Sequence, residues 1–297
     1  MDETKTFPFI SIVICTLNRR RLLRDCLNSI LKMEYPKSRY EMIIVDGGST
    51  DGTEELCKDF SEIRFITEGR FGLAYARNKG AELARGSIVA YTDDDCVVDV
   101  QWLRSLVSGF HASKAIVGVG GPVYPLHPEI IPRKILVKAA LGLYSAGQEV
   151  KPVQCIITSN SAFKTEIFDS IRFDEALGVT RRGRRILSGE DVDFCQTLVA
   201  SGIKLLYTPY AKVYHQISTD RLKVAYILRR SFEGGIGEAR ILLKKRNSRI
   251  WAFRYAVGRL VQSIFQILSD RSFTSCYVLI NSLSALFVCF TGLDKVL

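Results

Sequence analysis

The sequence predicts an α/β protein, in which helices flank a mostly parallel, doubly wound sheet and a helical C-terminal region follows. Five apolar, β-branched runs have the length of buried strands: 9–15, 41–46, 63–67, 87–92 and 115–121. Helical patterns alternate with these runs, which is the order of a parallel sheet covered by helices. Acidic residues close two of the runs. Since ligands bind at the carboxyl ends of strands in such sheets, these acids predict a binding crevice.

The periodicity of apolar residues predicts the helices of the first half. They are expected over 22–31, from the turn at 47–53 through Phe60, over 73–84 and over 99–110. Ser49 or Thr50 is placed to cap the second helix, and Gly86 to end the third.

The second half is less regular. Residues 122–152 hold five prolines, which indicates loops with one short helix near 133–143. Strands are predicted at 153–158, 203–209 and 211–215, and a helix capped by Ser188 over 190–201. We expect a catalytic domain over 1–220 and a C-terminal helical region over 221–297.

Composition favours a folded protein in a reducing compartment. The chain has 297 residues, a net charge of +10 and eight cysteines without a CxxC pair, so we expect free thiols. The N-terminus lacks the pattern of a secretory signal, and a cytoplasmic location is expected. A basic surface suits phosphate-bearing substrates or anionic lipid.

The C-terminal region has the pattern of a membrane-associated segment. Residues 272–293 carry no charge and have about the length needed to span a bilayer, although polar residues interrupt them. An amphipathic stretch at 260–268 with basic residues upstream resembles an interfacial helix. The alternative is a helical hairpin that packs on the catalytic domain or on a partner subunit.

Three consecutive acids, Asp93, Asp94 and Asp95, end the fourth predicted strand. Alternation along a strand would place Asp93 and Asp95 in one pocket and turn Asp94 away. Two carboxylates at this spacing suit Mg2+ or Mn2+, with water and phosphate oxygens as further ligands. The alternative is an acidic surface loop.

A second acidic group, Glu190, Asp191 and Asp193, opens a predicted helix. Either its charges complement the helix dipole, or one carboxylate is a general base. Upstream, the arginines at 181, 182, 184 and 185 form either a phosphate-binding loop or a solvated one. His215 follows a strand and is a weaker metal-ligand candidate. No G-x-G-x-x-G follows the first strand, and P-loop and zinc spacings are absent, which argues against dehydrogenases, P-loop enzymes and zinc proteins.

Taken in order, these motifs resemble the family 2 glycosyltransferases of GT-A fold over about residues 9–216. The matching pieces are SIVICTLNR, IIVDGGSTDGT, GLAYARNKGAELARGSIVAYTDDDC, TSNSAFKTEIF and GEDVDFCQTLVASGIKLLYTPYAKVYH. The resemblance implies an inverting transfer of a sugar from a nucleotide-sugar donor to an acceptor hydroxyl, with Mg2+ or Mn2+ as cofactor. Many members have a second acid in the nucleoside turn, where this chain has Gly47, so the nucleotide is not assigned.

The resemblance also implies roles for individual residues. Asp191 is expected to be the catalytic base, supported by Glu190. Asp95, Asp93 and His215 are expected to hold the metal. The donor is expected to bind a larger set: Thr16, Asn18, Arg19, Asp46, Ser49, Arg77, Asp93, Asp94 and Arg184.

Expected partners are the donor, a glycan or lipid-linked acceptor and the cytoplasmic face of the membrane, and not nucleic acid. Two other functions remain open. A sugar nucleotidyltransferase would need a Gly-rich loop after the first strand, where this chain has TLNRRRLL. A non-catalytic membrane scaffold would not need intact Asp93, Asp95 and Asp191.

Overall fold

The computed structural model describes residues 7–70, 72–131, 138–179, 186–187, 189–246, 249–270 and 273–291. The chain forms two compact units. The first consists of Met1–Leu126, Leu143–Glu175 and Glu190–Gln216, and the second of His127–Gly142, Ala176–Gly189 and Ile217–Leu297. Three parts of the expected 1–220 domain, residues 127–142, 176–189 and 217–220, therefore belong to the second unit.

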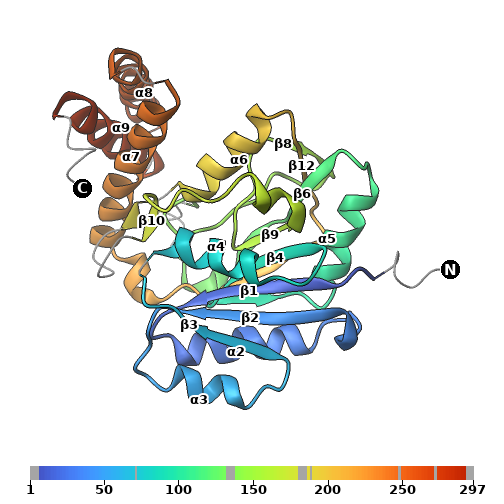
Figure 1. Ribbon diagram of the computed structural model, residues 1–297. Helices are drawn as coiled ribbons and strands as arrows, with labels where there is room; N and C mark the ends of the chain where they lie inside the picture. Colours follow the sequence, from blue (N-terminus) through green and yellow to red (C-terminus); the bar gives the residue numbers. More distant parts are fainter. Residues whose placement is uncertain are drawn as a thin grey trace. The chain divides into compact units, whose positions relative to one another are not determined.

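The first unit contains a mixed sheet, which has eight strands in the described part of the chain. In spatial order they are β3 (Ile63–Thr67), β2 (Tyr40–Asp46), β1 (Ile10–Thr16), β4 (Ile88–Asp93), β9 (Asn160–Lys164), β6 (Ile116–Gly120), β12 (Lys204–Tyr207) and β8 (Lys151–Val153). The first four are parallel, as predicted (Figure 1). Strand β9 is antiparallel to both of its neighbours, and β8 to β12. The sheet is therefore mixed.

Helices and a second, small sheet complete the first unit. The helices are α2 (Arg20–Leu31), α3 (Thr53–Lys58), α4 (Leu73–Leu83), α5 (Trp102–His111) and α6 (Glu190–Ala200), with short 3-10 turns at Lys37–Arg39 and Thr165–Asp169. The small sheet has the order β5 (Cys96–Val98), β13 (Val213–His215), β7 (Val123–Pro125). Its register pairs His215 with Cys96, so the histidine lies next to the segment that carries the three acids.

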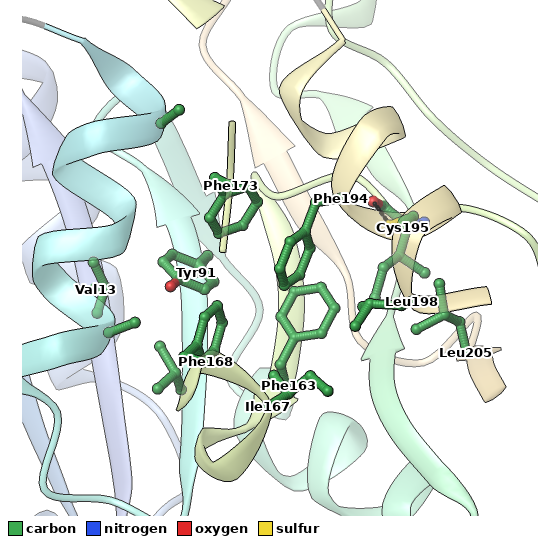
Figure 2. Close-up of a cluster of buried hydrophobic side chains, with 14 of the residues drawn as sticks. Val13, Tyr91, Phe163, Ile167, Phe168, Phe173, Phe194, Cys195, Leu198 and Leu205 are labelled. Atoms are coloured by element: carbon green, nitrogen blue, oxygen red, sulfur yellow. Dashed lines mark hydrogen bonds between the residues drawn. The ribbon is translucent and has the colours of Figure 1, made fainter. Parts of the chain in front are cut away.

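An aromatic cluster fills the core between the sheet and helices α4 and α6 (Figure 2). Phe173 stacks on Phe194 with ring centroids 4.1 Å apart, and Phe168 also stacks on Phe194, at 5.6 Å. Tyr91 of β4 meets Phe173 edge to face at 5.7 Å. Offset and edge-to-face pairs of this kind stabilise the core beyond the area that they bury. The cluster thereby fixes α6, whose first turn carries the second acidic group.

Four local predictions differ from the structure. Residues 153–158 are not one strand, because β8 ends at Val153 and β9 begins at Asn160. Helix α3 begins at Thr53, preceded by Gly52 with φ +82°, so neither Ser49 nor Thr50 caps it. Helix α4 ends at Leu83 and Ala84 is already extended, so Gly86 does not end the helix. The proposed Ser188 cap and residues 133–137 of the predicted 133–143 helix lie outside the described residues, and residues 138–142 form turns instead of a helix.

The second unit consists mainly of three long helices, α7 (Val224–Arg246), α8 (Arg249–Asp270) and α9 (Phe273–Thr291). A hairpin of β10 (Gly178–Val179) and β11 (Ile186–Leu187) and short 3-10 turns at Pro128–Ile130 and Thr219–Leu222 belong to the same unit. The helices pack through small apolar side chains: Ile236, Ala239, Ala252, Ala256, Ala285, Val288 and Cys289. Among the residues described, no helix combines the length and apolar character needed to cross a bilayer, α9 within the expected segment 272–293 included. Buried Ser282 and Ser284 interrupt its apolar pattern.

Candidate active site

The polar residues predicted to line a binding crevice meet at the carboxyl ends of β1, β2 and β4. In the sheet register Thr16 pairs with Asp46, and Cys15 pairs with Asp93. Three neighbouring strands therefore end in polar residues at one edge. Because parallel strands leave their carboxyl ends on the same side, the sequence pattern was sufficient to place this site.

The first group of the site is built around Arg19, which follows β1. Its Nη1 donates to Asp94 Oδ1 at 2.9 Å and to Asp95 Oδ2 at 3.0 Å. The hydroxyl of Thr16 donates to the second oxygen of Asp94 at 2.9 Å. His215 Nε2 lies 3.2 Å from Asp95 Oδ2. Both carboxylates are buried, whereas 40% of the Arg19 side chain remains exposed, so a ligand can reach the guanidinium.

The environment of this group keeps one positive charge at the surface. The carboxylate of Asp94 raises the pKa of Arg19, which stays cationic. Burial and the neighbouring Asp95 together raise the pKa of Asp94 to about 7, against the lowering effect of Arg19.

The expected alternation of the three acids is wrong. Strand β4 ends at Asp93, and Asp94 and Asp95 lie in the turn before β5. Strand alternation does not extend into a turn. As a result Asp94 and Asp95 share Arg19, while Asp93 contacts Arg77 on the other side.

The predicted metal trio is also only partly assembled. Across the described ranges, no three His, Cys, Asp or Glu side chains are grouped to hold a metal ion, and Asp93 is not grouped with Asp95 and His215. The remaining pair does fit a divalent cation. Cis ligands of an octahedral ion at about 2.1 Å are about 3 Å apart, and Asp95 Oδ2 and His215 Nε2 are separated by 3.2 Å. Since Mg2+ commonly keeps few protein ligands and takes phosphate oxygens, two residues suffice here.

The turn after β2 is held by its own polar side chains. Asp46 Oδ2 accepts from the N–H groups of Gly48 at 3.0 Å and Ser49 at 2.8 Å, and Oδ1 accepts from the Ser49 hydroxyl at 2.5 Å. Asn18 connects this turn to the loop after β1. Its N–H donates to Ser49 Oγ at 2.7 Å, and its Oδ1 accepts from Thr50 N–H at 2.8 Å. Asp46, Ser49 and Asn18, predicted to bind the donor, thus also shape the loop that would receive it.

Among the described residues other than glycine, Asn18 is the one with a positive φ, +52°. Asn tolerates this conformation better than most residues. Replacing Asn18 by Ala is expected to lower the free energy of unfolding by about 1–3 kcal/mol, because it adds backbone strain and removes the acceptor for Thr50. Asn18→Gly removes only the acceptor and should cost less in denaturant unfolding. A larger loss for the Gly variant would contradict this assignment.

The second group of the site is built around buried Arg77 of α4. Its Nη1 donates to Glu190 Oε1 at 2.7 Å, and its Nη2 donates to Asp93 Oδ1 at 3.2 Å. The guanidinium also lies over the ring of Phe173, 5.9 Å from the centroid. Burial favours a neutral arginine, but Asp93 and Glu190 outweigh it and raise the pKa of Arg77, which stays charged.

Arg77 was predicted to bind the donor, but its side chain is buried inside the protein. Its side chain is only 3% exposed, and protein carboxylates occupy its donors. Instead of facing the donor, it ties the end of β4 to the first turn of α6. Two residues that the sequence analysis missed support it. Tyr91 donates its hydroxyl to the Arg77 carbonyl at 3.1 Å, and Asn78 bonds both backbone groups of Phe173 at 2.9 Å. Apolar periodicity could assign Tyr91 and Phe173 to the core, but no local signal marks this contact.

Asp191 is the partly buried carboxylate at the start of α6. Its Oδ1 accepts from the N–H of Val192 at 2.8 Å, so the helix N-terminus holds its orientation. Burial and the neighbouring Glu190 raise the pKa of Asp191 to about 7, against the lowering effect of Arg77. A carboxylate that titrates near neutral pH is suited to accept a proton. Arg184, a predicted donor residue, lies outside the described part of the chain.

The fold and the site define an enzyme of the GT-A glycosyltransferase class. The model of the family described as "Glycosyl transferase family 2" matches residues 11–172, which is more than half of the chain. The chain belongs to glycosyl transferase family 2, and it is a glycosyltransferase.

Named relatives cover most of the chain. It is 29% identical over 264 residues to "Glycosyltransferase AglE" of Haloferax volcanii, covering 87% of this chain and 82% of that protein. It is 27% identical to "Glucosyl-dolichyl phosphate glucuronosyltransferase" of the same organism, covering 76% and 75%. A "Dolichyl N-acetyl-alpha-D-glucosaminyl phosphate 3-beta-D-2,3-diacetamido-2,3-dideoxy-beta-D-glucuronosyltransferase" of Methanococcus voltae is 23% identical, covering 86% and 81%.

Solved structures share the fold. The mannosyltransferase PcManGT from Pyrobaculum calidifontis, in complex with GDP-Man and Mn2+, aligns with a TM-score of 0.54 and 18% identity. That alignment covers 97% of this chain and 74% of the other. GalNAc-T7 with UDP, GalNAc and Mn2+ aligns with a TM-score of 0.61 and 17% identity, covering 84% and 51%. At these identities the likeness establishes the fold alone.

Proposed function

We propose that this chain is an inverting glycosyltransferase that moves a sugar from a nucleotide-sugar donor to a hydroxyl of a lipid-linked saccharide. The observation that carries the proposal is the position of Asp191. It lies in the first turn of α6, beside Glu190, which Arg77 ties to Asp93 at the end of β4. Asp93 is followed directly by Asp94 and Asp95, which hold Arg19. The proposed base and the proposed phosphate-binding arginine thus belong to two groups of charges that meet at the end of β4.

The reaction has simple proton and bond changes. The acceptor hydroxyl oxygen bonds to the anomeric carbon from the face opposite the donor phosphate, which inverts that carbon. The bond from the anomeric carbon to the diphosphate oxygen breaks, and the nucleoside diphosphate leaves with the electron pair. Asp191 accepts the hydroxyl proton as the new bond forms. Its raised pKa makes this transfer favourable near neutral pH.

The leaving group carries negative charge that the site must stabilise. The exposed part of Arg19 can donate to a diphosphate oxygen, while Asp94 and Asp95 hold its guanidinium in place and Thr16 holds Asp94. A divalent cation held by Asp95 and His215 would supply further charge neutralisation to the diphosphate. Structures of this fold have been solved with Mn2+ bound, which supports this part of the proposal.

The names of two relatives support a lipid-linked acceptor. Both are named for transfer to a saccharide on dolichyl phosphate, and each covers three quarters or more of this chain. We extend this to the chain as a proposal, together with action at the cytoplasmic face of the membrane. The net charge of +10 suits both a phosphate-bearing acceptor and an anionic surface.

The donor and acceptor can be identified with one assay. Purified protein is incubated with a panel of nucleotide sugars, with Mn2+, Mg2+ or chelator, and with polyprenyl-phosphate-linked saccharides or water-soluble glycans. Metal-dependent release of nucleoside diphosphate from one donor, increased by a lipid-linked acceptor, is the expected result. If only water-soluble glycans increase the release of nucleoside diphosphate, the lipid-linked acceptor is wrong, although the chain is still a sugar transferase.

The proposed base also predicts a pH dependence. A base must be deprotonated, so kcat/KM should fall about tenfold per pH unit below the pKa of Asp191, which is about 7. Above that pKa the rate should be level until another group titrates. The pH profile of the full enzyme at a fixed metal concentration tests this. A profile that is flat from pH 5 to pH 8 would contradict the assignment of Asp191.

A further inference from the structure

Helix α8 presents a row of apolar side chains to solvent. Ile250 is 75% exposed, Phe253 41%, Val261 47% and Ile264 43%, and Val257 between them is half-buried. At about 100° per residue these five positions fall within about 80° of the helix circumference. We call them the apolar stripe of α8; at a rise of about 1.5 Å per residue it is about 21 Å long.

The opposite face of α8 is already used for packing. Ala252 and Ala256 are buried in the cluster that joins α8 to α7 and α9. Arg259 donates to Glu238 of α7 at 3.3 Å, and Tyr255 donates to the same carboxylate at 3.3 Å. The stripe is therefore not the face that holds the second unit together. Contiguous exposed apolar side chains on a folded protein usually mark a binding surface.

Charge points to the kind of partner. Residues 217–297 contain thirteen Lys and Arg and five Asp and Glu, so this part of the chain carries +8 of the net +10. Between residues 239 and 269 there are seven basic residues and no acid. Arg254, which flanks the stripe on α8, is exposed, as are Lys244 and Lys245 at the end of α7. A second copy would bring the same positive charges against these, whereas an anionic surface neutralises them.

We propose that the apolar stripe of α8 lies in the headgroup region of an anionic bilayer, parallel to its plane. An apolar face flanked by cations is how amphipathic helices bind membranes without crossing them. Each Lys or Arg near an anionic surface adds about 1 kcal/mol, and the effect is screened by salt. The inference extends the proposed action at the membrane, but it depends on α8 alone and on no catalytic residue.

The test compares two neighbouring positions of α8. Val261 belongs to the stripe, whereas Gln262 is exposed beside it, so Val261→Glu and Gln262→Glu introduce the same charge on different faces. Binding is measured by co-sedimentation with vesicles of phosphatidylcholine alone or mixed with phosphatidylglycerol, at low and high salt. The full chain and Gln262→Glu should bind the anionic vesicles, and Val261→Glu should bind about tenfold or more weakly. Salt should weaken the binding of all three.

Two results would overturn the inference. One is equal vesicle binding by the two variants. The other is a dimer of the full chain, seen by light scattering, that Val261→Glu dissociates while the full chain binds no vesicles; this would identify a second copy as the partner. Circular dichroism and sugar transfer to a detergent-dispersed acceptor should be unchanged in Val261→Glu. If that transfer is absent in the full chain as well, the proposed function fails independently of the membrane surface.

Discussion

Asp191→Asn is expected to lower kcat/KM by about 10²–10⁴ while donor binding persists, because the amide keeps the shape of the side chain but cannot accept the acceptor proton. The orientation of the side chain should survive, since an Asn oxygen can still accept from the N–H of Val192. Asp25→Asn, on the exposed face of α2, changes the charge equally and should leave the rate unchanged. Nucleoside diphosphate release in the presence of acceptor measures the rate, and calorimetric titration with donor measures binding.

The same substitution should stabilise the protein at high pH. The pKa of Asp191 is about 7 in the folded protein and about 3.9 in an unfolded chain, so ionisation is penalised in the folded state. This penalty is absent when the pH is below 3.9, grows as the pH rises, and is complete above about pH 7. Asp191→Asn removes it and should raise the free energy of unfolding by about 1–3 kcal/mol at pH 8, with little change near pH 4. Loss of activity together with loss of stability at pH 8 would indicate a structural role instead of a base.

The location of the site could be predicted because it depends on strand order and on residue type. The four parallel strands from β1 to β4 lie within two residues of the runs expected from the sequence, and the polar residues that close them meet at one edge. Strand β9 was missed because its sequence, NSAFK, has few β-branched residues, and its burial comes from the neighbours β4 and β6. The strand conformation of β9 therefore comes from its tertiary contacts and not from local β propensity.

The roles inside the site were harder to predict. Whether Asp94 turns away from Asp95 depends on the residue at which β4 ends, and sequence patterns do not define strand ends to one residue. Arg77 lies on an otherwise ordinary helix, and its partners Asp93 and Glu190 are 16 and 113 residues away in the chain. The apolar character of α9 left both a membrane span and a packed helix open, because buried helix faces and lipid-facing ones have the same composition.

Arg77→Met is expected to cause the largest loss of stability, about 3–5 kcal/mol, because it leaves buried charge without a partner. The side chain of Glu190 is 11% exposed and loses its 2.7 Å contact, and Asp93 loses its contact at 3.2 Å. Methionine keeps much of the volume under Phe173, so a cavity contributes little to this loss. Urea unfolding at pH 8, where both acids are ionised in the unfolded chain, measures it.

A double substitution separates the lost charge partner from a general packing defect. The double variant Arg77→Met with Glu190→Gln lacks the more buried of the two carboxylates that Arg77 contacts. Its loss in free energy of unfolding should therefore be smaller than the sum of the losses of the two single variants. Additive losses would mean that the two side chains are not energetically coupled. Arg77→Lys, which keeps the charge but cannot contact both acids with a planar fork, should fold and retain part of the stability. Arg77 lowers the pKa of Asp191. A folded variant without a positive charge at position 77 should therefore have a higher pKa at Asp191. As the pH falls, it should lose activity at a higher pH than the original enzyme does.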